Sequence, residues 1–120
     1  MDSYLNTSTE QLTHGAKEAP IIAARDRFQF VDGRKTEKRE GSAYTILLPD
    51  GKSLAVKVED SALAVTQESI NAAYVAGRFI MADFVELQIR PYVDKTGKQQ
   101  FSARAKEILI SHKDTKAGVI

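Results

Sequence analysis

The stretch that decides the fold runs from Asp83 to Ile110 and reads DFVELQIRPYVDKTGKQQFSARAKEILI. Its two halves are rich in β-forming residues and flank the turn sequence DKTG at 94–97, an arrangement typical of a β-hairpin. A three-residue loop with Gly97 in the left-handed conformation would pair Asp94 with Lys98. The stretch therefore predicts one hairpin with a defined register.

That register divides the side chains of the hairpin between two faces. One face is apolar and contains the pairs Leu87–Ala105, Ile89–Ala103 and Pro91–Phe101. The other is a polar, basic strip with the pairs Glu86–Lys106, Gln88–Arg104, Arg90–Ser102 and Tyr92–Gln100. A slip of one residue would mix the two sets, so the hydrophobic pattern favours this register. The strip by itself is also compatible with an ordinary solvated sheet face.

The composition excludes several classes of protein. The chain has 120 residues, no cysteine and a net charge near +1. This length suits one domain that buries a core without metals or disulfides, and the lack of cysteine fits a reducing compartment. No apolar run approaches the ~20 residues of a membrane span, and the first residues lack a signal-peptide profile. We therefore expect a cytoplasmic protein without a membrane partner, whose total charge does not indicate a polyanion ligand.

The two ends of the chain differ from its middle. Residues 1–20 are rich in polar residues with sparse apolar ones, which predicts a flexible arm. Residues 111–120 lack periodicity and predict a flexible tail. The domain is predicted at 21–110. Within it, 21–31 alternates like a strand, and 32–41, bounded by glycines and full of charges, predicts a long exposed loop.

A second hairpin is predicted at 42–58. The sequence LPDG at 48–51 places proline at the second position of a type I turn and glycine at the left-handed position that follows. The core-facing pairs of this hairpin are Tyr44–Val56 and Ile46–Leu54. The phenol of Tyr44 needs a polar partner if it is buried.

One helix is predicted at 66–76, where Thr66 can cap the first turn and Gly77 can end the last. Its short apolar stripe is typical of core packing. A further strand begins at 79–81 and leads into the hairpin of 83–110. Five short strands that can all pair antiparallel, with one helix between the third and fourth, indicate a β-sandwich or a closed barrel. Closure would hide the edges that a flat sheet exposes.

Candidate catalytic groups are few. His14 and His112 lie in the two tails, and Glu59 and Asp60 are neighbours in a predicted loop. None of them is held in the geometry of a triad or an acid–base pair. The sequence has no HExxH, GxGxxG or Walker motif. We therefore expect a non-enzymatic protein with no metal site and no cofactor.

Binding of nucleic acid is better supported. Proteins that hold single strands need cations that follow the phosphates and flat rings on which bases stack. In a five-stranded barrel of this order, the 32–41 loop and the 94–98 turn would border one sheet face. The predicted binding residues are Arg34, Lys35, Lys38 and Arg39 in the loop, Lys95 and Lys98 in the turn, and Gln88, Arg90, Tyr92, Arg104 and Lys106 on the strip. Because Glu37, Glu40 and Glu86 offset these cations, we expect modest, salt-dependent affinity.

The arrangement from Ile21 to Ile110 resembles an OB-fold, a five-stranded antiparallel Greek-key barrel that commonly binds oligonucleotides on its strand face and on its first and fourth connections. The segments FVELQIRPY (84–92) and SARAKEI (102–108), separated by a glycine turn, are also similar to small DNA-processing accessory proteins of bacterial conjugative elements. This resemblance implies a protein that coats single strands or assists a helicase or relaxase complex. The tail at 116–120 departs from the acidic, Phe-ended tail typical of bacterial housekeeping single-strand-binding proteins.

These observations predict a non-enzymatic protein that binds single-stranded nucleic acid, with DNA as the expected ligand, as an accessory to DNA processing or transfer. The alternative is a protein-interaction or assembly module, for example a structural subunit of a phage or mobile element. In that case the polar strip would contact another chain, and the protein could form oligomers.

Overall fold

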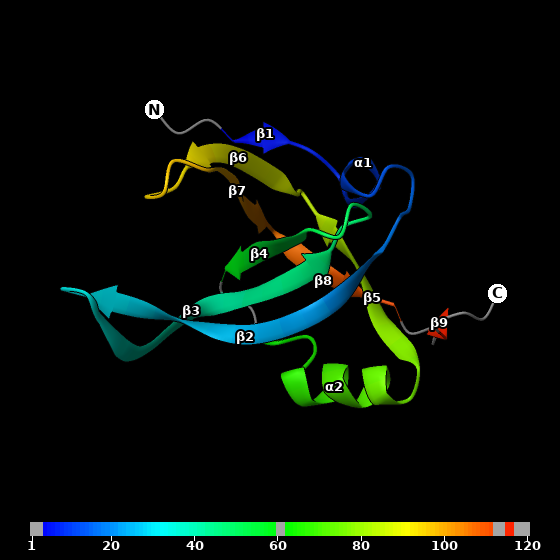
Figure 1. Ribbon diagram of the computed structural model, residues 1–120. Coiled ribbons are helices and arrows are strands. Elements are labelled where there is room, and N and C mark those ends of the chain that lie inside the picture. Colours follow the sequence, from blue (N-terminus) through cyan, green and yellow to red (C-terminus); the bar gives the residue numbers. More distant parts are fainter. Residues whose placement is uncertain (1–3, 60–61, 112–114, 117–120) are drawn as a thin grey trace.

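The computed structural model describes residues 4–59, 62–111 and 115–116. Its elements in chain order are β1 (Leu5–Asn6), α1 (Thr9–Leu12), β2 (Ala19–Val31), β3 (Arg34–Leu47), β4 (Ser53–Glu59), α2 (Gln67–Val75), β5 (Arg78–Val85), β6 (Gln88–Val93), β7 (Gln99–Ala105), β8 (Glu107–Ile110) and β9 (Thr115–Lys116) (Figure 1). The prediction of a mainly β fold is therefore confirmed. Neither helix in the described part of the chain is long and apolar enough to cross a bilayer.

The strands form one mixed sheet rather than the predicted five-stranded antiparallel barrel. Eight strands follow the order β1-β6-β7-β4-β3-β2-β5-β8, and β9 pairs with β5 outside this path. One neighbouring pair, β4 and β7, is parallel and joins Val56 to Ala103 and Val58 to Ala105. The strand count differs mainly because the two long arms of the last hairpin are each interrupted and because the N-terminal region adds β1.

The interruption of the last hairpin lies at Glu86, whose φ of 51° is in the left-handed region. This conformation is costly for a residue with a Cβ and breaks the ladder. The predicted pairs Glu86–Lys106 and Leu87–Ala105 are absent from the ladder for this reason. The register is nevertheless the same on both sides, since Val85 pairs with Glu107 and Gln88 pairs with Arg104.

The β6–β7 hairpin itself has the predicted register from Gln88–Arg104 to Tyr92–Gln100. Its turn is also as predicted: the Asp94 amide donates to the Lys98 carbonyl at 2.9 Å, and Gly97 has a φ of 84°. The β3–β4 hairpin has the predicted pairs as well, including Tyr44–Val56 and Ile46–Leu54. Local turn chemistry thus set both registers.

The predicted long loop at 32–41 is wrong. Asp32 and Gly33 alone make the turn, with φ of 52° and 77°, the paired positive values that a two-residue type I′ hairpin requires. β3 begins at Arg34, so the charged residues that follow lie along a strand. The β2–β3 hairpin projects from the body of the molecule (Figure 1), and charged side chains are tolerated there because both strands are largely solvated.

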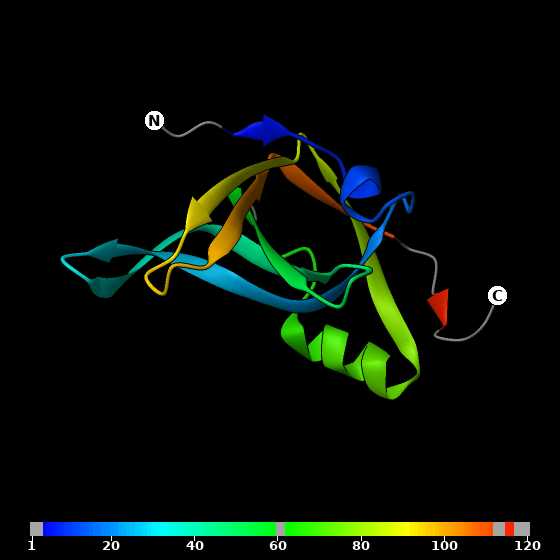
Figure 2. The same cartoon turned by 45° about the horizontal axis from the view of Figure 1, so that its top comes forward.

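The predicted flexible arm at 1–20 is also wrong for the residues that the structure describes. Leu5 and Asn6 pair with Ile89 and Gln88 of β6, and Figure 2 shows β1 lying along that strand. Ser8 caps α1, and Thr9 is fully buried. The predicted flexible tail at 111–120 falls mostly outside the described residues; within it, β9 pairs with Arg78 and Phe79 of β5.

The core is built from buried side chains of β2, β3, β4, β5 and β7, which Ile70 of α2 joins. Its fully buried members include Ile21, Tyr44, Ile46 and Val56. The Tyr44 hydroxyl accepts a hydrogen bond from the Ala64 amide at 2.8 Å, which provides the polar partner that burial of a phenol requires. As predicted, the N-cap of α2 is Thr66, which accepts from the Ser69 amide at 3.1 Å. α2 lies on the opposite side of the molecule from β1 (Figure 2).

The turn geometry gives a first prediction. Replacing Gly97 by Val should destabilise the fold by about 1 kcal/mol or more, because a β-branched residue is strained at positive φ. A Cβ at Gly97 would meet no atom within 4 Å, so a steric clash would not explain the loss. Urea unfolding provides the measurement, and Gly97→Asn is the matched control because Asn tolerates this conformation. Equal stability of the two variants would contradict the left-handed assignment.

Asp94 gives a prediction about pH. A hydrogen bond from the Thr96 side chain, with others from Gln100, Lys98 and the Thr96 amide, lowers the pKa of Asp94 from 3.8 to about 2. A lowered folded-state pKa contributes stability above the unfolded value, and this contribution is lost as pH falls from about 4 towards 2. The difference in unfolding free energy between wild type and Asp94→Asn should therefore shrink over that range. A difference that stays constant from pH 6 to pH 2 would refute this.

Candidate functional site

The outward face of the sheet carries a row of cations that crosses strands far apart in the sequence. Gln88 of β6 pairs with Arg104 of β7, and Arg104 pairs with Lys57 of β4. Lys57 pairs with Ala43 of β3, and Ala43 pairs with Arg25 of β2. Paired residues share a face of the sheet. We call Arg104, Lys57 and Arg25 the cationic row, and the surface around it the outer face.

Strand alternation forces these cations outward. In β4, Leu54, Val56 and Val58 are buried, whereas the residues between them are exposed. Lys57 therefore cannot turn inward without exposing two valines. Ala43, which separates Lys57 from Arg25 in the row, contributes only a methyl group and is itself buried. The row thus follows from the same alternation that builds the core.

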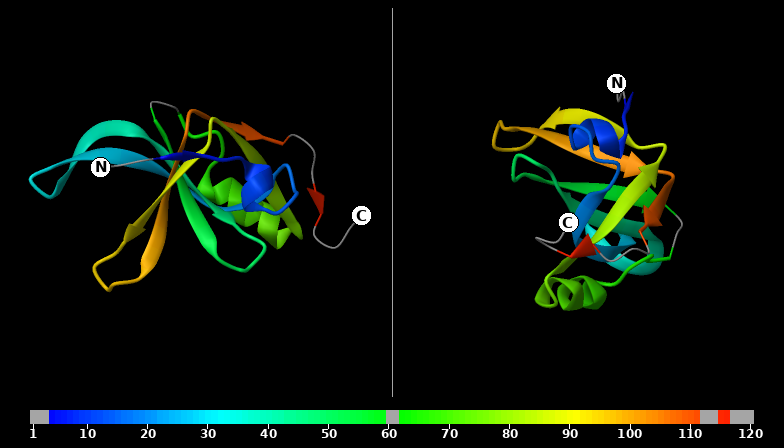
Figure 3. Two further views of the ribbon diagram at one scale, coloured as in Figure 1. Left: turned by 90° about the horizontal axis from the view of Figure 1, so that it is seen from above. Right: turned by 90° about the vertical axis from the view of Figure 1, so that its right-hand side faces the viewer.

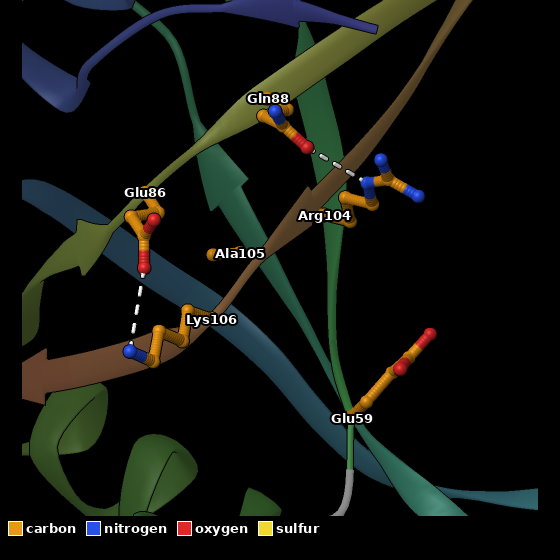
Figure 4. A pocket seen from close by; sticks show the side chains of 6 residues that line it. All are labelled: Glu59, Glu86, Gln88, Arg104, Ala105 and Lys106. Carbon is orange, nitrogen blue, oxygen red and sulfur yellow. Dashed lines mark hydrogen bonds and ion pairs between the residues drawn. The ribbon is translucent and has the colours of Figure 1, made fainter.

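Two hollows adjoin the cationic row. One, of about 360 Å³, is lined by Glu59, Glu86, Gln88, Arg104, Ala105 and Lys106 (Figure 4). The second, of about 330 Å³, is lined by Arg27, Gln29, Lys38, Arg39, Glu40 and Glu59. Glu59 lines both hollows, so they are neighbours. We refer to the two hollows together as the furrow, whose lining residues carry charges of both signs.

Hydrogen bonds and a ring contact hold Arg104 in place. Its Nε donates to Oε1 of Gln88 at 2.9 Å (Figure 4), and Nε2 of Gln88 donates to Oδ1 of Asn6 at 2.9 Å. The guanidinium carbon of Arg104 lies 3.7 Å from the ring centroid of Tyr4, and that of Arg90 lies 5.3 Å from it. These are cation–π distances. The N-terminal segment is thereby fixed to the outer face.

Acidic side chains partly neutralise the outer face. Lys106 lies 3.5 Å from Glu86, and both side chains are about 70% exposed. Arg27 lies 3.6 Å from Glu40. An exposed pair such as Lys106–Glu86 is weak, so a competing anion can replace that carboxylate at little cost. Among the described residues, neither Lys57 nor Arg25 forms an ion pair.

The structure brings part of the predicted set together. Gln88, Arg90, Arg104 and Lys106 share the outer face, as the hairpin register required. Tyr92 lies farther along the same strands and is 43% exposed. The turn residues Lys95 and Lys98 lie beyond it, and Lys98 lines a different groove, of about 770 Å³, together with Leu12, Leu48, Ile89 and Phe101 among others.

The four cations predicted in the first loop are dispersed along β3 instead. Arg39 Nε pairs with Asp26 at 2.6 Å, and Lys35 Nζ lies 4.4 Å from the centroid of the Phe28 ring. Arg34 lies beside the β2–β3 turn. Only Lys38 and Arg39 line the furrow. In the left view of Figure 3 the β2–β3 and β6–β7 hairpins diverge towards their tips.

Sequence reasoning missed Lys57, Arg25 and Tyr4. The alternation in the β3–β4 hairpin predicted that Lys57 faces outward. It did not predict that Lys57 pairs with Arg104 of β7. Arg25 has no local signal that distinguishes it from other charged residues of β2. Tyr4 lay in a segment interpreted as flexible. Of the catalytic candidates weighed, His14 follows α1, while His112 and Asp60 lie outside the described residues.

No protein family, curated protein or solved structure matched this chain. The assignment of function therefore depends on the geometry of the outer face.

Proposed function

We propose that this protein binds single-stranded nucleic acid, with DNA as the expected ligand, across its outer face. The observation that carries the proposal is the cationic row, which aligns Arg104, Lys57 and Arg25 over four strands beside a furrow. A row of cations can follow the negative charges of a phosphate backbone. A role as an accessory to DNA processing or transfer, beside a helicase or relaxase, would use this binding.

The neighbour relations of the strands support an OB-like architecture. If β5 with β6 and β7 with β8 are each counted as one bent strand, the order runs β2-β3-β4-(β7/β8)-(β5/β6) and returns to β2 through the β2–β5 pairing. Along the chain, α2 lies between β4 and β5, which are the third and fourth of these five strands in sequence order. In OB-folds the second and third strands carry the binding face. Here those strands are β3 and β4, and β4 contains Lys57.

The near-neutral charge of the chain limits the affinity that we expect for single-stranded nucleic acid. The furrow contains Arg27, Lys38, Arg104 and Lys106 but also Glu40, Glu59 and Glu86. Local repulsion from these carboxylates lowers the affinity for phosphates, so binding should be modest and should weaken steeply as salt is added.

The proposal can be tested by fluorescence anisotropy with a labelled oligo-dT at low ionic strength. Lys57→Glu and Arg104→Glu should each weaken binding at least severalfold, because each removes a cation that neutralises a phosphate and adds repulsion. The slope of log K against log salt should become shallower by about 0.7 for each phosphate that is no longer neutralised. Lys17→Glu is the control: it makes the same charge change at an exposed residue outside the cationic row.

Two results would count against the proposal. Wild-type protein that shows no salt-sensitive binding to oligo-dT at low ionic strength would refute it. A large fall in the melting temperature of Lys57→Glu or Arg104→Glu would show that these residues act in stability instead. Light scattering that gives a defined oligomer with an interface over Arg90 and Arg104 would favour the protein-interaction alternative.

Glu59 provides a test in which a substitution should strengthen binding. This residue lines both hollows, so a strand that follows the furrow must pass it. Glu59→Gln should tighten binding to oligo-dT by about twofold to fivefold, because removing one like charge near a phosphate is worth up to ~1 kcal/mol in water. Glu37→Gln, on the exposed part of β3, is the matched control. Unchanged affinity in Glu59→Gln would mean that the strand does not cross this point.

A further inference from the structure

We propose that Tyr4 is the principal base-stacking residue of the outer face. This inference rests on the proposed function and adds a specific contact to it. The cationic row explains how phosphates are held but supplies no flat surface for bases. Binding of single strands usually combines both.

The pairing of β1 places Tyr4 on the correct face. Asn6 pairs with Gln88, whose side chain belongs to the outer face, and Tyr4 is two residues before Asn6. Because side chains two residues apart in an extended chain point the same way, the Tyr4 ring lies on that face as well. The hydrogen bond between Asn6 and Gln88 at 2.9 Å holds the segment there. The ring is therefore attached to the sheet by both backbone and side-chain contacts.

The ring contacts two cations of the outer face. Arg104 and Arg90 approach its centroid to 3.7 Å and 5.3 Å. Both side chains belong to the β6–β7 hairpin. Tyr4 is partly exposed, and we expect a base to stack on the ring face that is more open to solvent. A base stacked on that face would lie next to Arg104, the first cation of the cationic row.

The two guanidinium groups also favour this use of the ring. They hold the ring in a defined orientation before a ligand arrives, which lowers the entropy cost of stacking. Arg104 donates a hydrogen bond to the neutral side-chain amide of Gln88, so the charge of Arg104 can also serve a phosphate beside the base. The contrasting arrangement, in which Tyr4 only covers Arg104 and must leave before a phosphate can bind, predicts the opposite effect of removing the ring.

The experiment compares two oligonucleotides with two variants. Tyr4→Ala should weaken binding to oligo-dT by about fivefold or more, in line with the measured range for base–aromatic stacking. On an abasic oligonucleotide of equal length the same substitution should change affinity by less than about twofold. Lys57→Glu should weaken binding to both, because it acts on phosphates. Tyr4→Phe is the conservative control and should bind oligo-dT like the wild type.

A spectroscopic readout separates stacking from a structural effect. The chain contains no tryptophan, so Tyr4→Trp introduces a single reporter. Oligo-dT should quench its fluorescence on saturation, and the abasic strand should quench it far less. Tighter binding by Tyr4→Ala, an equal loss on both strands, or no quenching of the bound Trp variant would each overturn the assignment. If wild-type protein binds neither strand, the proposed function itself fails.

Discussion

The parallel pairing of β4 with β7 is the contact on which the rest of this structure depends. It joins the β3–β4 hairpin to the β6–β7 hairpin through three residue pairs, which are Val56–Ala103, Lys57–Arg104 and Val58–Ala105. The first and third pairs lie in the buried core. The middle pair is therefore on the outer face, where it brings two cations from distant parts of the chain side by side. The β4–β7 register therefore determines both the packing of the core and the position of the cations in the candidate site.

The energetics of this register explain why two like charges are tolerated as neighbours. Burial of each valine contributes about 1.5–3 kcal/mol. Two unit charges 4 Å apart in water repel by only about 1 kcal/mol. Burial of the two valines on the inner face therefore determines the register. The repulsion between Lys57 and Arg104 on the outer face is smaller and does not change it. Such a surface is stabilised by any anion that lies between the cations, which links the packing of the core to the choice of ligand.

The parts of the fold that were predictable are those that local chemistry determines. The β6–β7 and β3–β4 registers followed from turns in which Gly97 and Gly51 supply positive φ. The β2–β3 turn was missed because Asp32-Gly33 was interpreted as the start of a charged loop, although the same two residues are a strong hairpin signal. Local patterns could not predict the β4–β7 pairing, because its partners are about 47 positions apart. Parallel strands are not joined by a short turn whose sequence would indicate the pairing. The site was predicted where it lies on one hairpin and missed where it crosses strands.

The ion pairs on the outer face bear on how a nearly neutral protein can bind a polyanion. Arg27 and Lys106 are partnered by Glu40 and Glu86 before any ligand arrives. A phosphate that takes over either cation exchanges one anionic partner for another, so it gains less than it would from a free cation and displaces fewer bound counterions. Lys57 and Arg25 lack such partners in the described part of the chain. The salt dependence of binding should therefore reflect the cationic row more than the full count of basic residues around the furrow, and the row rather than net charge determines where a single strand would lie.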